Sequence, residues 1–350
     1  MSARRSRAHR RLRPAWAPVI VATVLAACGS ATAAPSSPTQ PRGAASDAAA
    51  SGAPAVPRAS ANANETAAAA AATPSVTTVD GLTVTTISLG AGAAPIDVAS
   101  AFGSIWVALH RQGVVSRLDP DTLRETARIP VGAGPGWFAV TDDAVWVNSQ
   151  LGHGLTRIDP KTNDADVHVG QWATCGAPVI AFGSIWQMAC DAQQLMRIDP
   201  VHNTVADITA IGYIGVGVAG DDLVAIGTGA MATVDLATNK LVPLGPGPGG
   251  VPVAFVDSTA WMADSSAIRR FAIPSGKLLG TIPIGGETTV TLSSDRAWVT
   301  EFGVASSEVD ASSGAILRIV HLAKPTVARA LGDAVWVTSF DTSSVGWFSP

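Results

Sequence analysis

Charged residues are scarce in this 350-residue chain, at 14% of positions, and aromatic residues are scarcer still, at 5%. Apolar residues make up 47%. That share excludes disorder along the whole length, because disordered chains are poor in apolar residues and rich in charge. From position 76 onward, 15 basic residues stand against 25 acidic ones, a net charge of −10. A body this acidic repels phosphate backbones, so we expect no binding to nucleic acid.

The first apolar run of the chain, residues 15–25, is too short to span the hydrocarbon core of a bilayer. Arginines precede it, and a Leu-Ala-Ala-Cys motif follows that ends at Cys28. This is the layout of an export signal. The motif resembles the lipobox of bacterial lipoproteins, in which cleavage leaves the cysteine as an acylated first residue. The resemblance implies a signal peptide over 1–27 and a lipid on Cys28; an ordinary signal peptide is the alternative.

Such a lipid would hold the exported protein at the periplasmic or extracellular face of a bacterial membrane. The segment that follows, within 28–75, consists mostly of Ala, Pro, Ser, Gly and Thr. It has too few large apolar side chains to offset the entropy of ordering, so we expect a disordered tether. The folded body is then expected to span 76–350.

The body repeats with a period of about forty residues, which is typical of propeller blades. Six of the seven units have a tryptophan in an apolar strand, which we interpret as a packing element between blades. Three of them continue with Arg-Leu/Ile-Asp-Pro, whose Asp-Pro begins a turn. The sequence therefore predicts an all-β, seven-bladed β-propeller. The seven centres are Trp106, Trp146, Trp186, Ala225, Trp261, Trp298 and Trp336.

The two ends of the body predict how the ring closes. The first unit has four expected strands, near 95–101, 104–109, 114–119 and 124–130. The last unit stops at Pro350 after its third strand, whereas an additional strand over 84–90 precedes the first unit. An unpaired edge strand is an aggregation liability, so we expect this N-terminal strand to complete the last blade and close the ring.

The Gly-x-Ile-Trp-Val and Arg-Ile-Asp-Pro lines resemble the propellers of streptogramin (virginiamycin B) lyases and related YVTN-repeat bacterial proteins over roughly residues 82–350. The line 298–302 is similar to one in those lyases, whose sites use carboxylates with Mg²⁺ and a histidine. The resemblance implies that Glu301 could hold Mg²⁺ or Ca²⁺. However, no histidine lies between His202 and His321, so only His110 or His153 could act as the base. A metal-dependent C–O lyase is therefore the alternative function.

Only two cysteines remain in the body, Cys175 and Cys190. They flank an expected hairpin turn near Gly183 at equal distances along the chain. Opposed residues of an antiparallel pair have Cα separations within the disulfide range, and export permits oxidation. We therefore predict a disulfide between them.

In a propeller of this strand order, the links between blades share one face with the loops between second and third strands. A polar ring around the central opening there is a plausible ligand site. We expect a non-catalytic, membrane-tethered monomer that binds a protein partner or a small ligand on this face, without a cofactor. No catalytic residue is assigned, and the protease, hydrolase and phosphate-loop motifs are missing. The candidate ligand-binding residues are His110, Trp137, Gln150, His153, Asp191, Asp264, Glu301 and Asp341.

Overall fold

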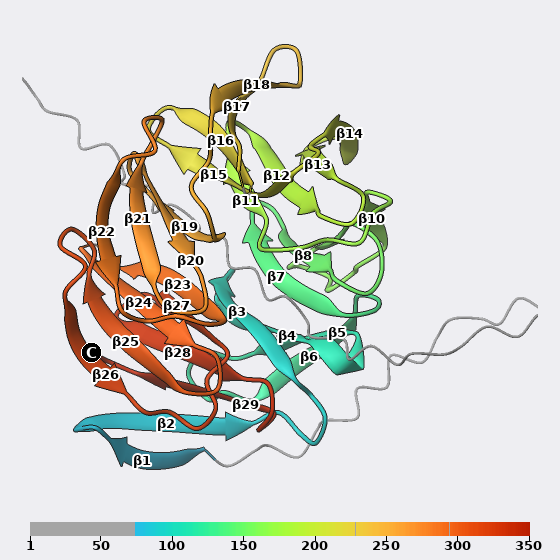
Figure 1. Cartoon of the computed structure of the whole chain (residues 1–350). Coiled ribbons are helices and arrows are strands. Elements are labelled where there is room, and N and C mark those ends of the chain that lie inside the picture. The colour runs from blue at the N-terminus through green and yellow to red at the C-terminus, as the bar shows by residue number, and fades with distance from the viewer. Residues whose placement is uncertain (1–73, 228, 294) are drawn as a thin grey trace, which may run out of the picture. The chain divides into compact units, whose positions relative to one another are not determined.

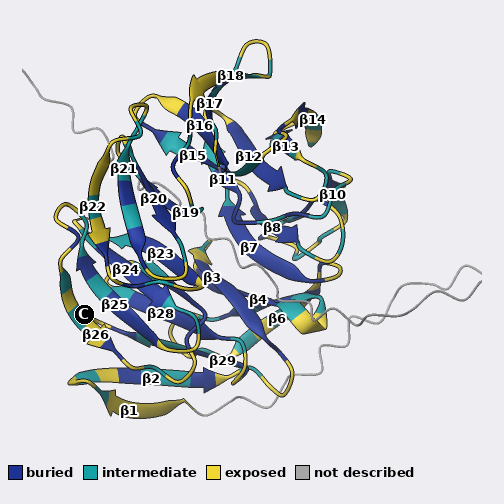
Figure 2. Ribbon diagram, viewed as in Figure 1, coloured by how far each residue is buried: buried dark blue, intermediate teal, exposed yellow. Residues whose placement is uncertain are grey.

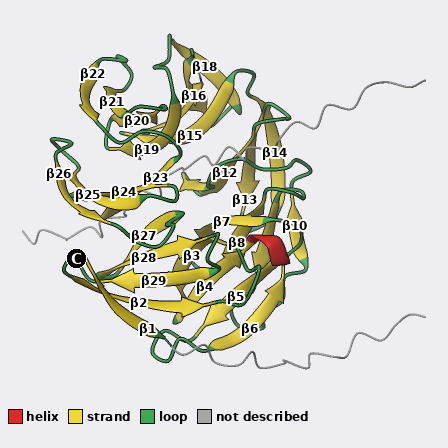
Figure 3. Cartoon of the chain, turned by 60° about the horizontal axis from the view of Figure 1, so that its bottom comes forward, coloured by secondary structure: helices red, strands yellow, loops and turns green. Residues whose placement is uncertain are grey.

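The computed structural model describes residues 74–227, 229–293 and 295–350, which form seven antiparallel sheets in a ring (Figure 1). The seven-bladed, all-β propeller predicted from the repeats is confirmed. The signal peptide, Cys28 and nearly all of the expected tether lie outside the described residues. One 3₁₀ turn, η1 (His110–Gln112), is drawn red in Figure 3. No helix among the described residues is long and apolar enough to cross a membrane.

Each of blades 1 to 6 consists of four consecutive strands, and the first strands of neighbouring blades contact each other around the centre. Blades 1 to 3 are β3 (Pro95–Ala101), β4 (Ser104–Leu109), β5 (Val114–Leu118), β6 (Glu125–Pro130); β7 (Pro135–Val140), β8 (Val145–Ser149), β9 (Leu155–Ile158), β10 (Val167–Val169); β11 (Val179–Ala181), β12 (Ser184–Ala189), β13 (Gln194–Asp199), β14 (Thr204–Thr209). Blades 4 to 6 are β15 (Tyr213–Ala219), β16 (Asp222–Gly227), β17 (Met231–Asp235), β18 (Lys240–Gly245); β19 (Val251–Val256), β20 (Thr259–Ala263), β21 (Ile268–Ala272), β22 (Leu278–Ile282); β23 (Thr288–Ser293), β24 (Arg296–Glu301), β25 (Ala305–Asp310), β26 (Ile316–Val320).

Blade 7 joins the two ends of the described chain. Its strands are β27 (Val327–Leu331), β28 (Ala334–Ser339), β29 (Ser344–Phe348) and β2 (Leu82–Ser88). β2 pairs antiparallel with β29, which confirms the predicted closure. A fifth strand that was not predicted, β1 (Ser75–Val79), pairs with the outer edge of β2. Asp80 and Gly81 join the two strands with φ angles of 48° and 82°, the left-handed pair that a type I′ hairpin turn requires.

The first two strands of the blades are mostly buried and the outermost strands are mostly exposed (Figure 2). The six repeat tryptophans are buried, as a packing role between blades requires. Trp106, for example, lies in one apolar cluster with Phe138 and Val147 of blade 2, and its indole nitrogen donates to the carbonyl oxygen of Ala101 at 2.9 Å. The tryptophans therefore stabilise the contacts between neighbouring blades.

The arginine of the repeated Arg-Leu/Ile-Asp-Pro line connects blades. In blade 1, the Arg117 guanidinium lies 4.7 Å from the ring centre of Trp106. Its Nη1 donates to the carbonyl oxygen of Pro160 at 2.7 Å and to Oδ1 of Asn163 at 2.8 Å, both in a turn of blade 2. We call this arrangement an arginine clasp.

Two further arginine clasps repeat the arrangement. Arg197 of blade 3 donates to the carbonyl oxygen of Leu236 and to Oδ1 of Asn239 in blade 4, each at 2.7 Å. Arg270 of blade 5 donates to the carbonyl oxygens of residues 311–313 in blade 6. In blade 2, Arg157 instead pairs with Asp143 of its own blade. The clasps therefore join blades 1 to 2, 3 to 4 and 5 to 6.

In blade 4 the centre of the repeat differs from the one predicted from the sequence. Blades 1, 2, 3 and 5 place the tryptophan opposite an arginine, as in the pair Trp106 and Arg117. In blade 4, Thr233 stands at the place of the arginine, two positions before the turn aspartate. Its partner on the neighbouring strand is Val224, which therefore stands at the place of the tryptophan. The expected centre, Ala225, was therefore wrong by one residue. The space that the indole would fill is taken by Phe255 of blade 5, which packs in one cluster with Val224.

Gly217 makes this replacement possible, and its substitution tests the packing. A Cβ built at Gly217 would lie 2.1 Å from Cδ2 of the Phe255 ring. We expect Gly217→Ala to lower the free energy of unfolding by about 1–3 kcal/mol, because the core cannot accept the extra methyl group without moving the ring. Denaturant titration measures this change. Gly249→Ala is the control, since a Cβ there meets nothing within 4 Å. An equal effect of the two substitutions would contradict the packing argument.

The predicted disulfide is confirmed. Cys175 and Cys190 are bonded, with their Cα atoms 5.8 Å apart. Cys175 belongs to the link between blades 2 and 3, whereas Cys190 directly follows β12. The bond therefore fixes a loop between strands to a link between blades on the face where the ligand site is expected.

Candidate ligand-binding face

The links between blades and the loops between second and third strands lie at one end of the propeller, which we call the loop face. The best-defined group of side chains on it surrounds Phe340, which directly follows β28. The ring centre of His110 lies 5.9 Å from that of Phe340. The guanidinium carbon of Arg111 lies over the same ring, 4.7 Å from its centre. Turn η1 of blade 1 thus presents a cation and an imidazole to an aromatic ring of blade 7.

The link between blades 1 and 2 extends this group. Gly134, with φ at 63°, leaves room for two side chains: a Cβ there would lie 2.7 Å from Cγ of Leu151 and 3.0 Å from Cε1 of His110. Leu151 is 70% exposed, an unusual position for a large aliphatic side chain. Gln150 lies beside it, with its Cγ 3.1 Å from the place of a Cβ on Gly136. We define His110, Arg111, Gln150, Leu151 and Phe340 as the Phe340 cluster.

The protonation state of His110 follows from its surroundings. Burial lowers the pKa of His110. The hydrogen bond to the Pro135 carbonyl opposes this shift in part, and the charge of Arg111 adds a smaller lowering. The imidazole is therefore neutral at pH 7. Its Nδ1 lies 3.2 Å from the carbonyl oxygen of Pro135, which can only accept, so Nδ1 carries the proton. Nε2 is left with its lone pair as a hydrogen-bond acceptor.

Trp137, one of the predicted ligand residues, lies under the Phe340 cluster. Its side chain is fully buried and packs with Ile96 and Ala177, and Phe340 packs against the same group. Its backbone N–H donates to Oδ1 of Asn148 at 2.7 Å. Trp137 therefore supports the ring of Phe340 from below.

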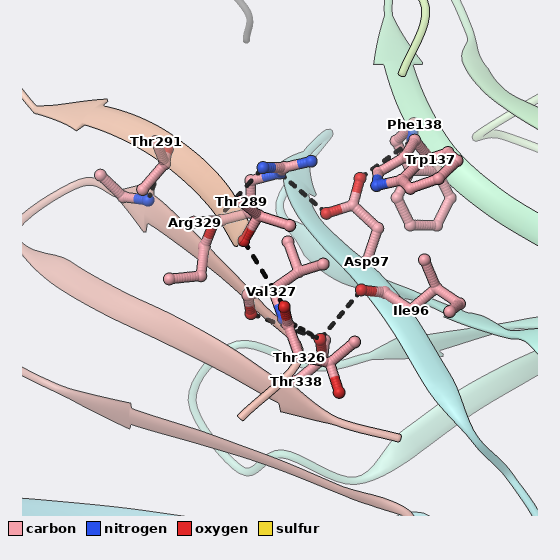
Figure 4. A network of polar contacts seen from close by, with 12 residues as sticks. Ile96, Asp97, Trp137, Phe138, Thr289, Thr291, Thr326, Val327, Arg329 and Thr338 are labelled. Atoms are coloured by element: carbon pink, nitrogen blue, oxygen red, sulfur yellow. Dashed lines mark hydrogen bonds and ion pairs between the residues drawn. The ribbon is translucent and has the colours of Figure 1, made fainter. Parts of the chain in front are cut away.

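A network of polar contacts joins the inner strands of blades 7, 1 and 2 near Trp137 (Figure 4). Nε of Arg329, in blade 7, forms an ion pair with Oδ1 of Asp97, in blade 1, at 2.8 Å. The other carboxylate oxygen of Asp97 accepts from the backbone N–H of Phe138, in blade 2, at 3.1 Å. Thr338 also donates to the carbonyl oxygen of Ile96 at 2.9 Å. Blades 7, 1 and 2, which carry the Phe340 cluster, are thus fixed to one another.

Two of the predicted acids are engaged locally. The carboxylate of Asp264 accepts from the backbone N–H groups of Ser266 (2.8 Å) and Ala267 (3.1 Å) and pairs with Arg269. Asp341, next to Phe340, pairs with Lys324 at 3.4 Å. Their hydrogen-bonding capacity is partly used within their own loops.

The remaining predicted residues lie on separate blades. His153 and Asp191 are exposed in loops of blades 2 and 3, and Glu301 ends β24 in blade 6. Across the described parts of the chain, no group of three or more His, Cys, Asp or Glu side chains could hold a metal ion. Glu301, the metal ligand under the lyase alternative, therefore has no such group around it. Of the predicted residues, His110 and Trp137 both pack against Phe340. Gln150 and Asp341 are the chain neighbours of Leu151 and Phe340, and the other predicted residues lie apart.

Sequence reasoning missed Phe340 and Leu151, because it searched the loops for polar side chains. A signal was present, since both are large apolar residues inside loops that are otherwise polar. Their meeting with η1 depends on how blades 7, 1 and 2 pack, which no local pattern specifies.

No family model matches the chain, and no curated protein matches its sequence. Solved structures share the fold. A hydrazine synthase structure from Kuenenia stuttgartiensis matches with a TM-score of 0.62 at 12% identity, over 75% of this chain and 97% of that one. A streptogramin B lyase matches at 0.60 and 14%, over 76% and 97%, and BamB from Moraxella catarrhalis at 0.53 and 13%, over 79% and 100%. At these identities the likeness shows the propeller fold alone.

Proposed function

We propose that the protein is an exported, lipid-anchored propeller that binds a ligand or partner through the Phe340 cluster, without catalysing a reaction. The observation that carries this proposal is the stacking of Arg111 on Phe340 beside His110, at the meeting point of blades 7, 1 and 2. The binding group that fits best combines a carboxylate with an apolar body.

The carboxylate preference follows from Arg111. No acidic side chain of the described residues forms an ion pair with it, although the folded body carries a net charge of −10. A guanidinium presents donors in a planar fork that matches a carboxylate, and its stacking on Phe340 orients that fork. An arriving carboxylate would therefore meet a preformed, uncompensated donor group.

The apolar preference follows from Phe340 and Leu151. Phe340 is half-buried and supported by Trp137, so its ring is held in place before binding. Leu151 exposes most of its surface next to His110. Arginine and aromatic side chains dominate binding energy at many interfaces, where apolar neighbours exclude water around them. The solved neighbours include a lyase, a hydrazine synthase and BamB, so the fold by itself favours no activity.

Titration with N-acetylphenylalanine and with its uncharged amide tests the proposal. We expect the acid to bind about tenfold more tightly than the amide, a difference of about 1.4 kcal/mol. Arg111→Gln should remove this preference, and Phe340→Ala should weaken both probes. Isothermal titration or NMR shift perturbation measures the affinities.

Arg128→Gln is the matched control, since Arg128 lies on the outer strand β6 and pairs with Glu125. Its affinities should equal those of the unsubstituted protein. Equal binding of acid and amide, or a preference that persists in Arg111→Gln, would contradict the assignment of the site.

A further inference from the structure

The outermost strand of every blade leaves one edge without a strand partner among the described residues, and six of the seven blades protect that edge. Unprotected edges pair with other chains, and proteins prevent this with bulges, charges, proline or short strands. The outer strands β6, β18, β22 and β26 each have a register shift against their neighbour. β10 has only three residues, and β14 carries a charged side chain at Asp207.

Within its five residues, the outer strand of blade 7 has none of these protections, and the nearest proline and charge are Pro74 and Asp80 at its two ends. β1 reads Ser-Val-Thr-Thr-Val, without charge, proline or glycine. It pairs with β2 over five consecutive residues with no register shift. Val76 is 64% exposed, and β1 lies at the rim of the ring with its outer side free of other described strands (Figures 1 and 2).

We propose that β1 is a docking edge for β1 of a second copy of this chain, in place of the monomer expected from the sequence. An antiparallel pair with its two-fold axis at Thr77 uses the whole strand. It places Ser75 opposite Val79, Val76 opposite Thr78, and Thr77 opposite itself. A two-fold axis perpendicular to the sheet requires such a register, because paired residues must point to the same face. A Thr–Thr pair is favourable across antiparallel strands.

The charges favour a second copy over a partner recognised by ion pairs. The nearest charged residue, Asp80, accepts from the backbone N–H of His321 at 2.7 Å and lies 3.0 Å from its Nδ1. Asp80 is therefore engaged within its own chain. Because β1 itself has no charged residue, no two like charges face each other across the paired strands. The net charge of the two bodies still repels them at a distance, so salt should strengthen association by screening. A contact of one strand is small, so the dimer is weak and depends on concentration.

Sedimentation velocity of the full chain with Cys28→Ala, which leaves no site for the lipid, tests the proposal. We expect a monomer–dimer equilibrium that shifts toward the dimer as salt is raised. Thr77→Lys should raise the dissociation constant at least tenfold, since two lysines would face each other across the axis. The unfolding midpoint of this variant should be unchanged, because Thr77 is exposed.

Cysteine cross-linking tests the register even if Thr77→Lys perturbs the fold. Thr77→Cys, in the same background, should form a disulfide-linked dimer on mild oxidation, because residues paired with themselves come within disulfide range. Thr78→Cys should cross-link poorly, since each Thr78 faces Val76 of the other copy. Thr126→Cys, on the bulged edge β6, is the control for random collision.

A monomer at every concentration and salt would overturn the proposal. So would a dimer that Thr77→Lys leaves intact, or cross-linking of Thr126→Cys as efficient as that of Thr77→Cys. None of these readouts uses the Phe340 cluster, so this inference and the proposed function can fail separately.

Discussion

Removal of residues 75–88 is expected to abolish the cooperative unfolding transition of the propeller. β2 contributes buried side chains to two different apolar clusters. Val84 packs with Trp298 and Val320 of blade 6, whereas Ile87 packs with Val98 and Ile105 of blade 1. Without this strand, blade 7 loses the buried contacts that Val84 and Ile87 make with its two neighbours, and β29 is left with an unpaired edge.

Single substitutions in β2 and β1 measure how much individual side chains contribute to this stability. Ile87→Ala should lower the free energy of unfolding by about 2–5 kcal/mol, as for other buried large-to-small changes. Val76→Ala, in the neighbouring strand β1, should change it by at most about 0.5 kcal/mol, because Val76 is exposed. Calorimetry of the deletion and denaturant titration of the point variants measure these changes. A transition that survives the deletion unchanged would show that the ring does not depend on β2.

Arg197→Met is expected to lower the free energy of unfolding by about 3 kcal/mol. The substitution removes hydrogen bonds from a charged donor to the carbonyl oxygen of Leu236 and to Oδ1 of Asn239, leaving both acceptors without this partner. It also removes the guanidinium from the face of Trp186, which lies 5.2 Å away. Denaturant titration at constant pH measures the change.

Arg157→Met is the matched control, because Arg157 occupies the same place in the repeat. Its guanidinium contacts Asp143, a largely exposed carboxylate of its own blade, at 2.8 Å. Exposed ion pairs contribute at most about 1 kcal/mol. Equal losses from the two substitutions would show that the arginine clasps do not join the blades.

The sequence predicts the blades well because each is a local unit. In the first unit, the expected strands agree with the observed ones to within one residue at either end. The tryptophan period counts the blades, and the missing fourth strand of the last unit predicts the closure. The offset at Ala225 arose because that blade lacks its tryptophan, and only the pairing of Val224 with Thr233 fixes the register.

Other features depend on contacts between blades and could not be read from one unit. The arginine of the repeat is visible in the sequence, but its acceptors lie in the next blade, at Pro160 for Arg117. Strand β1 is an exception, because a local signal was present: Asp80-Gly81 between two β-branched runs indicates a hairpin. The Phe340 cluster required residues from three blades to meet.

The pairing of β2 with β29 also sets the order in which the fold can be completed. Ser88 of β2 pairs with Ser344 of β29. Nearly the whole described chain must therefore be synthesised before β2 can pair with β29. Contacts this distant in sequence form slowly, because the entropy of closing the loop must be overcome first. Blades 1 to 6 contain all their own strands and can form while the chain lengthens. Ring closure is then the last step of folding, and a chain truncated near its C-terminus keeps two unsatisfied strand edges.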